Sequence, residues 1–363
     1  MTAPPAVVCG TRFGRVYLEA LSAPDAPYRL VGILARGSER SRACAEHYGV
    51  PLHTDVDDVP DVAAAFVVVG SGLAGGPGAE LARGFLDRGV PVLQEHPLHP
   101  DELADCIRAA RRNRTVHHVD TLFLHVEPVR RFIGAARALL DRQDAVFVEV
   151  TCGHQVLQTA LDVVVAVLGG IGWSSFVAHP PEPGPFRTVA GELAGVPLAL
   201  RVQHELDPAE PDNHAHVLHR ITIGTEGGQL TLVATHGPVV WTPRAHMPAD
   251  VAQQVPMHAS GAAHLDLPSG EVLGPPSAPS YRDVLARLWP DAIRRAATAL
   301  RVDVEDAGRG GDGGRAHAQH QLALSRLTRE VNELLGPVPL VRRPTPRVLG
   351  PADFLPVATE VRG

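Results

Sequence analysis

The run Gln94-Glu95-His96-Pro97 carries the clearest chemistry in the chain, because it places an imidazole directly after a short apolar segment. An unperturbed imidazole has a pKa of about 6.5, so it can give or take a proton near neutral pH. The chain contains no lysine, since all 33 of its basic side chains are arginines. Mechanisms that need a lysine as base, Schiff-base partner or phosphate ligand are therefore excluded. His96 becomes the leading candidate for a catalytic proton donor.

A second motif lies between the first expected strand and the first expected helix. Cys9-Gly10-Thr11-Arg12-Phe13-Gly14 has glycines where a dinucleotide-binding fold turns sharply and presents helix N–H groups to a pyrophosphate. Arg12 replaces the middle glycine of the usual Gly-x-Gly pattern, and its guanidinium can itself contact phosphate. We assign Gly10, Thr11, Arg12, Phe13 and Gly14 to cofactor binding. The alternative is a strand-to-helix turn that binds nothing.

The end of the second expected strand indicates which dinucleotide is bound. Enzymes that prefer NAD usually place Asp or Glu there, where it holds the ribose 2′-hydroxyl. This chain has Arg36, followed closely by Ser38 and Arg40, and these side chains suit a 2′-phosphate. NADPH is therefore the expected cofactor. The alternative is a solvated arginine at the end of a strand.

Two further residues complete the predicted cofactor site. Ser71 lies in Gly70-Ser71-Gly72, which ends the third expected strand. Glu95 precedes His96 and is expected either to orient its imidazole or to meet the ribose. Metal binding is not expected, because the histidines at 214, 216, 219, 317 and 320 lack Cys, Asp or Glu at a spacing suited to zinc.

Residues 6 to about 120 alternate short apolar runs with helical segments, the pattern of a parallel, doubly wound sheet. The expected strands cover residues 6–9, 29–35, 63–69, 90–93 and 115–118, and the expected helices cover 13–21, 39–48, 80–88 and 101–112. Ligands of such sheets bind at the carboxyl ends of the strands. His96 occupies such an end.

The second half of the chain has a different pattern, that of an α+β domain. Helices are expected at 128–140, 155–168, 281–300 and 317–335, strands of a mostly antiparallel sheet at 145–151, 197–206, 216–224 and 229–236, and proline-rich loops at 180–185 and 243–276. The chain therefore divides into a Rossmann domain over 1–122, an α+β substrate and oligomerisation domain over 123–335, and a tail over 336–363 that packs on the surface.

The composition is that of an ordinary globular protein, with 45% hydrophobic and 20% charged residues. A net charge of -7 without a basic cluster argues against a nucleic-acid-binding protein. The four cysteines form no Cys-x-x-Cys pair, which is typical of reduced thiols. No apolar run approaches the roughly 20 residues of a membrane span, and the start lacks the pattern of a signal peptide. A cytoplasmic protein without membrane contact is expected.

The motifs together resemble one branch of the glucose-fructose oxidoreductase/inositol dehydrogenase (Gfo/Idh/MocA) family, the thiazolinyl imine reductases. In the wider family the corner at 95–97 usually reads Glu-Lys-Pro, and the lysine moves the proton that accompanies hydride transfer. Histidine in that place is the most discriminating feature of the branch. The resemblance spans roughly residues 6 to 335 and rests on residues 8–14 with Tyr17, 94–100, 224–228, 235–238 and 319–321.

This resemblance implies NADPH-dependent reduction of a cyclic C=N to a thiazolidine. The substrate would be a nonribosomal peptide or siderophore intermediate attached to a carrier protein. His96 would supply the proton to the ring nitrogen, and Pro97 would follow a cis peptide bond, as in the family. A homodimer is also expected by analogy with the family.

Two positions depart from the family patterns. The family's His-x-x-Asp pair reads Thr159-Ala160-Leu161-Asp162, so the aspartate is kept and the histidine is replaced. We assign Asp162 a catalytic role, and its alternative is a cap or pair within the core. Phe123 stands where the branch has a tyrosine and is expected to stack on the substrate. Gln155 and Gln158, at the start of the same helix as Asp162, are also assigned to substrate binding.

Two other functions stay open. An NAD(P)-dependent sugar or polyol dehydrogenase of the wider family would show NAD dependence and the complete lysine and histidine set. Neither is seen in the sequence, although Asp162 remains. A non-catalytic NADPH-binding protein of an assembly line is consistent with Phe123 and Arg12.

Overall fold

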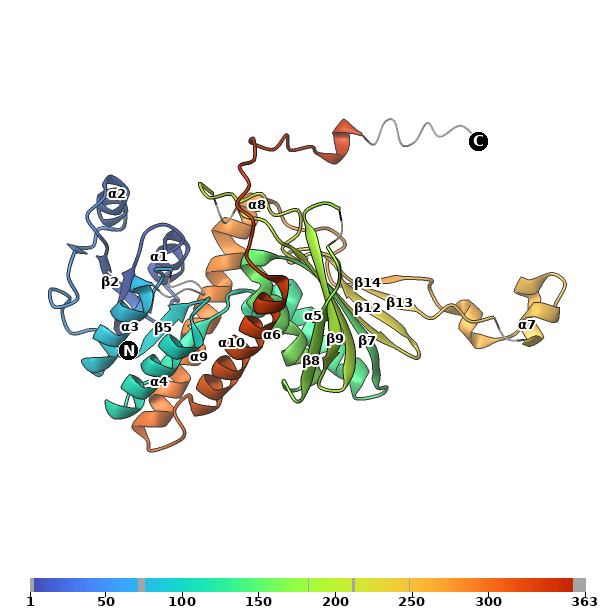
Figure 1. Ribbon diagram of the computed structural model, residues 1–363, viewed down its shortest axis with the longest axis horizontal. Coiled ribbons are helices and arrows are strands. Elements are labelled where there is room, and N and C mark those ends of the chain that lie inside the picture. Colours follow the sequence, from blue (N-terminus) through green and yellow to red (C-terminus); the bar gives the residue numbers. More distant parts are fainter. Residues whose placement is uncertain (1–2, 71–75, 182, 211–212, 248, 355–363) are drawn as a thin grey trace.

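The first half of the chain forms a six-stranded parallel sheet with helices on both faces, as expected (Figure 1). The computed structural model describes residues 3–70, 76–181, 183–210, 213–247 and 249–354. The strands are β1 (Pro5–Cys9), β2 (Arg29–Leu34), β3 (Leu52–His53), β4 (Ala64–Val67), β5 (Val92–Glu95) and β6 (His117–Asp120), in the order β3-β2-β1-β4-β5-β6. The helices are α1 (Arg15–Ser22), α2 (Glu39–Tyr48), α3 (Pro77–Asp87) and α4 (Pro100–Arg112). The two-residue strand β3 was not expected from the sequence.

The continuous apolar character of the strands follows from burial on both faces. In β1, Ala6 and Val8 pack into the core on the side of α1, whereas Val7 and Cys9 pack on the side of α3 and α4. All four are fully buried. The strand order reverses between β1 and β4, so their carboxyl ends open the crevice where doubly wound sheets bind ligands.

The second domain packs helices α5 (Glu127–Leu140) and α6 (Leu157–Leu168) on one face of an eight-stranded sheet (Figure 1). In chain order the strands are β7 (Ala145–Gly153), β8 (Ser174–Ala178), β9 (Phe186–Leu193), β10 (Val196–Gln203), β11 (His219–Thr225), β12 (Gly228–Leu232), β13 (Val239–Pro243) and β14 (Glu271–Leu273). Their order in the sheet is β14-β13-β12-β11-β7-β10-β9-β8, and only β7 and β10 pair in parallel. The mostly antiparallel sheet is confirmed.

The extent of this sheet corrects the expectation of four strands. β8, β9 and β13 were not predicted, and β14 lies inside the segment 243–276 that was expected to be a loop. The short strand β14 is largely exposed, so it has no apolar alternation to reveal it. The strand expected at 229–236 ends instead at Leu232, and His236 lies beyond it.

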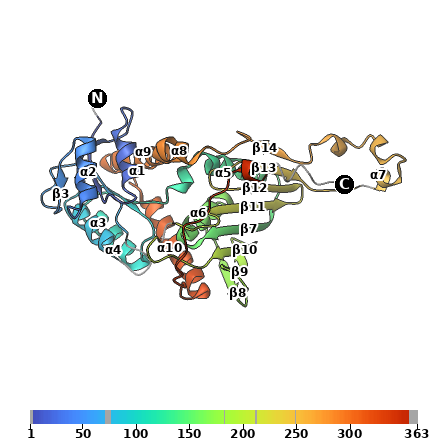
Figure 2. The ribbon, with the colours of Figure 1, turned by 90° about the horizontal axis from the view of Figure 1, so that it is seen from above.

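Two long helices lie between the domains, α9 (Trp289–Gly308) and α10 (Arg315–Leu335) (Figures 1 and 2). α9 packs on α1 of the first domain, and α10 contacts both α4 and α6. These helices come late in the chain, yet they complete the core of the first domain. The predicted domain limits at 122 and 335 stay predictions.

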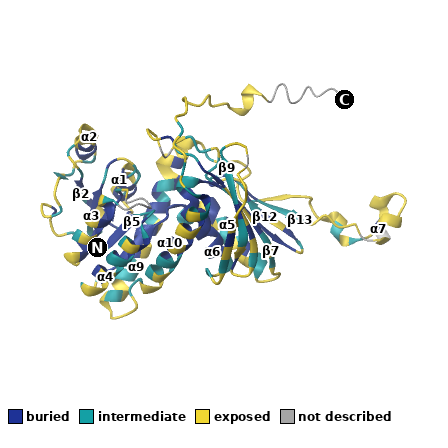
Figure 3. Cartoon of the chain, in the orientation of Figure 1, coloured by how far each residue is buried: buried dark blue, intermediate teal, exposed yellow. Residues whose placement is uncertain are grey.

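The outer parts of the molecule are a projecting segment and the tail. Residues 244–247 and 249–270, which include α7 (Ala249–Gln253), extend beyond the sheet, and most of them are exposed (Figures 2 and 3). After α10, Leu340 forms a bridge with Leu206, and Val341 N–H donates to the Leu206 carbonyl at 2.9 Å. None of the described helices is long and apolar enough to cross a membrane. The remaining short elements are η1 (Phe123–His125), η2 (His154–Val156), η3 (Met257–Ala259), η4 (Ala263–Asp266), α8 (Tyr281–Asp283), η5 (Val284–Leu288) and η6 (Pro351–Asp353).

Candidate functional site

The glycine turn after β1 has the shape that a dinucleotide needs. Gly10 has φ +95°, and its N–H donates to the Leu34 carbonyl at 2.9 Å. A Cβ on Gly10 would lie 2.3 Å from the Val68 carbonyl oxygen, and one on Gly14 would lie 2.2 Å from the Gly10 carbonyl oxygen. Only glycine fits at either position.

The helix that follows this turn leaves its N-terminus open for an anion. α1 begins at Arg15, its N-cap residue Gly14 has no side chain to cap it, and its first turn contains no acidic residue. The first N–H groups of such a helix have no partner within the helix and carry a partial positive charge. The turn therefore fits the pyrophosphate of a nicotinamide dinucleotide. Of the other assigned residues, Thr11 is buried, Phe13 is half-buried and Arg12 is exposed.

The residues predicted to select NADPH lie at the end of β2, on the same edge of the sheet. Arg36 and Arg40 are exposed, and neither makes an ion pair with another residue in the described part of the chain. Ser38 caps α2, because its hydroxyl accepts the Ser41 N–H at 3.2 Å. Ser71 lies outside the described residues.

His96 directly follows β5 and is held in one orientation by the neighbouring strand β6. Its Nδ1 lies 3.1 Å from the Asp120 carbonyl oxygen, and its backbone N–H donates to the same oxygen at 3.2 Å. A carbonyl can only accept, so Nδ1 carries the hydrogen and Nε2 is left for a substrate. The His96-Pro97 peptide is cis, as expected.

Asp120, at the end of β6, supports this arrangement and was not singled out in the sequence. Its carboxylate is buried and accepts the Tyr17 hydroxyl at 2.6 Å and the Leu122 N–H at 2.7 Å. Burial and the Asp120 carboxylate raise the pKa of Tyr17, so this hydroxyl stays protonated and donates. The available signal was an acidic residue close to the carboxyl end of the strand expected at 115–118.

Burial lowers the pKa of His96 below its ordinary value, while the hydrogen bond to Asp120 and the charges of Asp120 and Asp162 oppose this shift. The resting imidazole is therefore neutral near pH 7. The two carboxylates favour its protonated form, which is the form that can donate a proton.

Asp162 lies in α6 and is fully buried, so its charge is balanced by several donors. His320 Nε2 lies 2.7 Å from Oδ1, the Thr121 hydroxyl donates to Oδ2 at 3.0 Å, and Gln321 Nε2 approaches Oδ2 at 3.5 Å. The hydrogen bond to Asp162 raises the pKa of His320. Asp162 and His320 thus form a hydrogen-bonded pair beside the His96 site, and this pair is ionic when His320 is protonated. The catalytic role of Asp162 stays a prediction.

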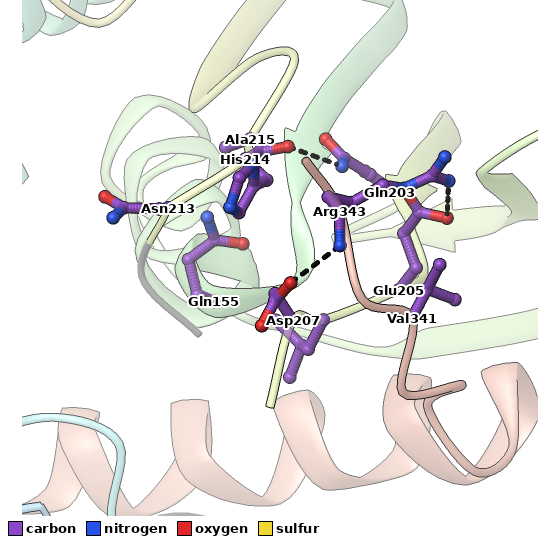
Figure 4. Close-up of a pocket in the computed structure, with 10 residues that line it drawn as sticks. Gln155, Gln203, Glu205, Asp207, Asn213, His214, Ala215, Val341 and Arg343 are labelled. Carbon is purple, nitrogen blue, oxygen red and sulfur yellow. Dashed lines mark hydrogen bonds and ion pairs between the residues drawn. The ribbon is translucent and has the colours of Figure 1, made fainter. Parts of the chain in front are cut away.

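The two predicted glutamines lie in different surroundings. Gln158 is buried, and its Oε1 has no hydrogen-bond partner among the described residues. Gln155 lines a small hollow with Asp207, His214 and Arg343 at the surface of the second domain (Figure 4). The Arg343 N–H donates to Asp207 there at 2.8 Å, so part of this hollow is closed by the tail.

Another histidine, His219, lies beside Thr159, the residue that replaces the histidine of the family pattern. The Thr159 hydroxyl lies 2.7 Å from His219 Nε2, and the Thr235 hydroxyl lies 2.9 Å from His219 Nδ1. Burial lowers the pKa of His219 to about 3, so this ring stays neutral. His219 can therefore orient neighbours but cannot supply a proton near neutral pH.

Phe123 belongs to a cluster of rings between the glycine turn and the second domain. Its ring packs edge-on against His219, with centroids 5.0 Å apart, and against Trp289 at 6.1 Å. Trp289 Nε1 donates to His236 Nε2 at 3.0 Å, and its ring lies 5.7 Å from Phe13. Phe13, Trp289 and His236 are only partly buried, so this aromatic wall can receive a flat ring. No pattern in the sequence indicated that α9 returns to this place.

The histidines considered for zinc do not come together. His214 pairs with Glu210 at 3.3 Å, whereas His317 Nε2 accepts the Val119 N–H at 3.1 Å. Within the described ranges, no group of three His, Cys, Asp or Glu residues could hold a metal ion.

We expect His320→Gln to destabilise the protein in a pH-dependent way, by about 1 kcal/mol at pH 6, because Asp162 loses its cationic partner. The pKa of His320 is raised on folding, so its stabilisation is full below the unfolded value near 6.5 and is lost as the pH rises through the folded value. Melting temperatures of wild type and variant should therefore differ at pH 6 and converge by pH 9. The same substitution at the exposed His258 serves as the control. A melting temperature of His320→Gln that is lowered equally at pH 6 and pH 9 would contradict the charged pair.

Two family models match this chain, one in each domain. Residues 5–121 match the oxidoreductase family with an NAD-binding Rossmann fold, and residues 143–242 match the C-terminal domain of Irp3-like thiazolinyl imine reductases. The first domain thus matches the Gfo/Idh/MocA oxidoreductases, and the second matches the Irp3-like reductases. The predicted resemblance is thereby confirmed for both domains, and this oxidoreductase has a first domain of the NAD-binding type.

Solved structures share the fold of this oxidoreductase at low sequence identity. A dehydrogenase from Chromobacterium violaceum has 13% identity and a TM-score of 0.63, with 100% of each chain covered. A 3-ketoreductase from Actinomadura kijaniata in complex with TDP-benzene and NADP has 16% identity and a TM-score of 0.60, covering 90% of this chain and 96% of the other. An oxidoreductase from Agrobacterium radiobacter in complex with NAD+, L-tartaric acid and magnesium has 12% identity and a TM-score of 0.61, with 91% and 96% covered. No curated protein sequence matches the chain.

Proposed function

We propose that this oxidoreductase uses NADPH to reduce the C=N bond of a thiazoline, carried on a nonribosomal peptide or siderophore assembly line, to a thiazolidine. The observation that carries the proposal is His96, an imidazole at the end of β5 with Nδ1 engaged by Asp120 and Nε2 left for the substrate. The match of residues 143–242 to thiazolinyl imine reductases supports the same substrate class. A carrier protein is the proposed partner, and a homodimer is the proposed assembly.

The reaction adds one hydride to the ring carbon and one proton to the ring nitrogen. A bound reduced nicotinamide supplies the hydride. The turn at Gly10 and Gly14 with the N-terminus of α1 would hold the pyrophosphate, and the aromatic wall of Phe13, Trp289 and His236 would receive the flat ring of the substrate. Protonated His96 gives its Nε2 proton to the ring nitrogen and keeps its Nδ1 hydrogen on the Asp120 carbonyl. The site needs no tyrosine at position 123 for this step.

The direct test mixes the purified protein with NADPH and a hydroxyphenyl-thiazoline thioester surrogate. Loss of NADPH absorbance together with a product heavier by two hydrogens is expected. NADPH that binds without either change would reject this substrate class.

A second candidate is oxidation of an alcohol, as in a sugar or polyol dehydrogenase. The pair of Asp162 and His320, 2.7 Å apart, is the observation that favours it, because an imidazole paired with a carboxylate can accept a proton when the imidazole is neutral. A panel of polyols with NAD+ and NADP+, run in parallel, separates this activity from imine reduction.

We expect the rate of imine reduction to fall as the pH rises. Burial lowers the pKa of His96 below 6.5, so the protonated fraction falls about tenfold per pH unit above that pKa. The measurement is kcat between pH 5 and 8, with saturating substrate. The same profile in His96→Ala would show that the slope belongs to protonation of the substrate rather than to His96.

We expect Arg36→Ala to raise the Michaelis constant for NADPH about tenfold or more while leaving that for NADH nearly unchanged, because only NADPH carries a 2′-phosphate. Arg29, exposed at the opposite end of β2, provides the matched control Arg29→Ala. Equal changes for both cofactors in Arg36→Ala would remove Arg36 from cofactor selection.

A further inference from the structure

A hollow of about 290 Å³ lies at the edge of the first domain, away from the end of β5 that carries His96. It is bounded by the end of α4, the beginning of the edge strand β6 and the glycine-rich loop before α10, and α4 and α10 lie near each other in Figure 1. β6 begins at His117 and ends at Asp120, so the two ends of this strand are roughly 10 Å apart. The hollow is therefore separate from the dinucleotide edge.

The hollow has an excess of positive charge. Arg111, Arg114 and Arg315 line it together with Asp312, and the Asp306 carboxylate accepts the Gly313 N–H of the same loop at 3.1 Å. None of the three arginines forms an ion pair with any residue that the structure describes. This cluster stands out in a chain whose net charge is -7.

A long helix begins at this hollow without any cap. α10 has 21 residues, its N-cap residue is Gly314, and its first turn contains no acidic residue. Arg315 is its first residue, where a cation is unfavourable because the helix N-terminus is itself positive. An anion bound in the hollow would offset this repulsion between the Arg315 cation and the helix N-terminus.

A buried imidazole and a buried hydroxyl beside the hollow lack partners. His117 is 3% exposed, and its Nε2–H donates to the amide oxygen of Gln94 at 3.0 Å. Its Nδ1 therefore carries a lone pair, and that atom has no partner among the described residues. Thr115 Oγ1, also at the hollow, is buried and unpaired in the same way. Burial, with a contribution from His118, lowers the pKa of His117 to about 3, so Nδ1 stays an acceptor at physiological pH.

We propose that this hollow binds phosphate, either as the free ion or as a monoester. The arginines and the N-terminus of α10 balance the negative charge, and a P–O–H group donates to His117 Nδ1. Thr115 supplies a further hydroxyl contact. Inorganic phosphate keeps at least one such hydrogen near pH 7, and a monoester keeps one in its monoanionic form. Sulfate has none, so the site distinguishes phosphate from an ion of the same shape.

The test is titration calorimetry at pH 7 with inorganic phosphate and, separately, sulfate at matched ionic strength, in the presence of saturating NADPH. We expect one phosphate site that binds at least about tenfold more tightly than sulfate, since one hydrogen bond to a buried acceptor is worth roughly this factor. Equal affinity for the two ions, or phosphate that is displaced by NADPH, would overturn the proposal. Glycerol 3-phosphate, compared with phosphate and with glycerol alone, tells the monoester from the free ion.

Three variants test the assigned residues. Arg315→Ala and Thr115→Val should fold as well as the wild type or better, because one removes a cation from a helix N-terminus and the other removes an unpaired buried hydroxyl. Both should weaken phosphate binding, Arg315→Ala by about tenfold. Arg309→Ala, an exposed arginine of the same loop that does not line the hollow, should bind as the wild type does. Phosphate affinity that is unchanged in Arg315→Ala and Thr115→Val would overturn the assignment.

Discussion

His96→Ala should lower kcat for thiazoline reduction by about 10²- to 10⁴-fold, the usual contribution of a positioned general acid. In the proposed reaction the imidazole of His96 is the donor, because its Nδ1 is engaged by the Asp120 carbonyl and its Nε2 is left for the substrate. His219 cannot replace it, since its pKa of about 3 keeps it neutral. NADPH binding should persist, because the backbone N–H of residue 96 still bonds Asp120.

The measurement is kcat with saturating substrate, together with an NADPH titration of both proteins. His47→Ala, an exposed histidine in α2, serves as the control and should react like the wild type. Added imidazole should restore part of the activity of His96→Ala if the lost group is a proton donor. A variant that keeps its kcat would remove His96 from the mechanism.

Gly10→Ala should destabilise the first domain by about 2 to 4 kcal/mol and weaken NADPH binding at least about tenfold. The new methyl group would lie 2.3 Å from the Val68 carbonyl oxygen, and φ +95° strains any other residue. The turn must therefore shift, and with it the backbone that is expected to hold the pyrophosphate. Chemical denaturation and an NADPH titration measure the two effects.

A Gly89→Ala variant distinguishes the effect of a positive φ from the effect of a steric clash with the new methyl group. Gly89 has φ +75°, and a Cβ there meets nothing within 4 Å. This variant should lose about 1 kcal/mol and bind NADPH as the wild type does. If Gly10→Ala behaves the same way, the turn does not depend on its close contact with Val68.

The second domain shows which strands can be predicted from local sequence patterns and which cannot. β7 and β10 were predicted because they alternate buried and exposed residues over long runs. β14 has three residues and no buried member, so its place in the sheet depends on pairing with β13 and not on its own pattern. Strands at a sheet edge are specified by their neighbours, and a reading of single segments does not find them.

The candidate site likewise has features that local patterns predict and features that they do not. His96, the glycine turn and Arg36 each follow a strand, so their shared edge could be predicted from the order of strands and helices. Other contacts of the candidate site join residues that lie far apart in the chain. His320 contacts Asp162 across 158 positions, and Trp289 contacts His236 across 53. No local pattern predicts such pairs.

By itself, the sequence determined a Rossmann domain followed by an α+β domain, a chemistry without lysine, and a histidine near the carboxyl end of the strand expected at 90–93, the fourth of its series. Only the tertiary structure decided which nitrogen of His96 is free, that Asp162 is paired with a histidine, and that α9 brings Trp289 beside Phe13 and Phe123. The physical reason is that strand and turn formation depend on residues near in the chain. The charge of a carboxylate and the proton of an imidazole depend on burial and on partners that only folding brings together.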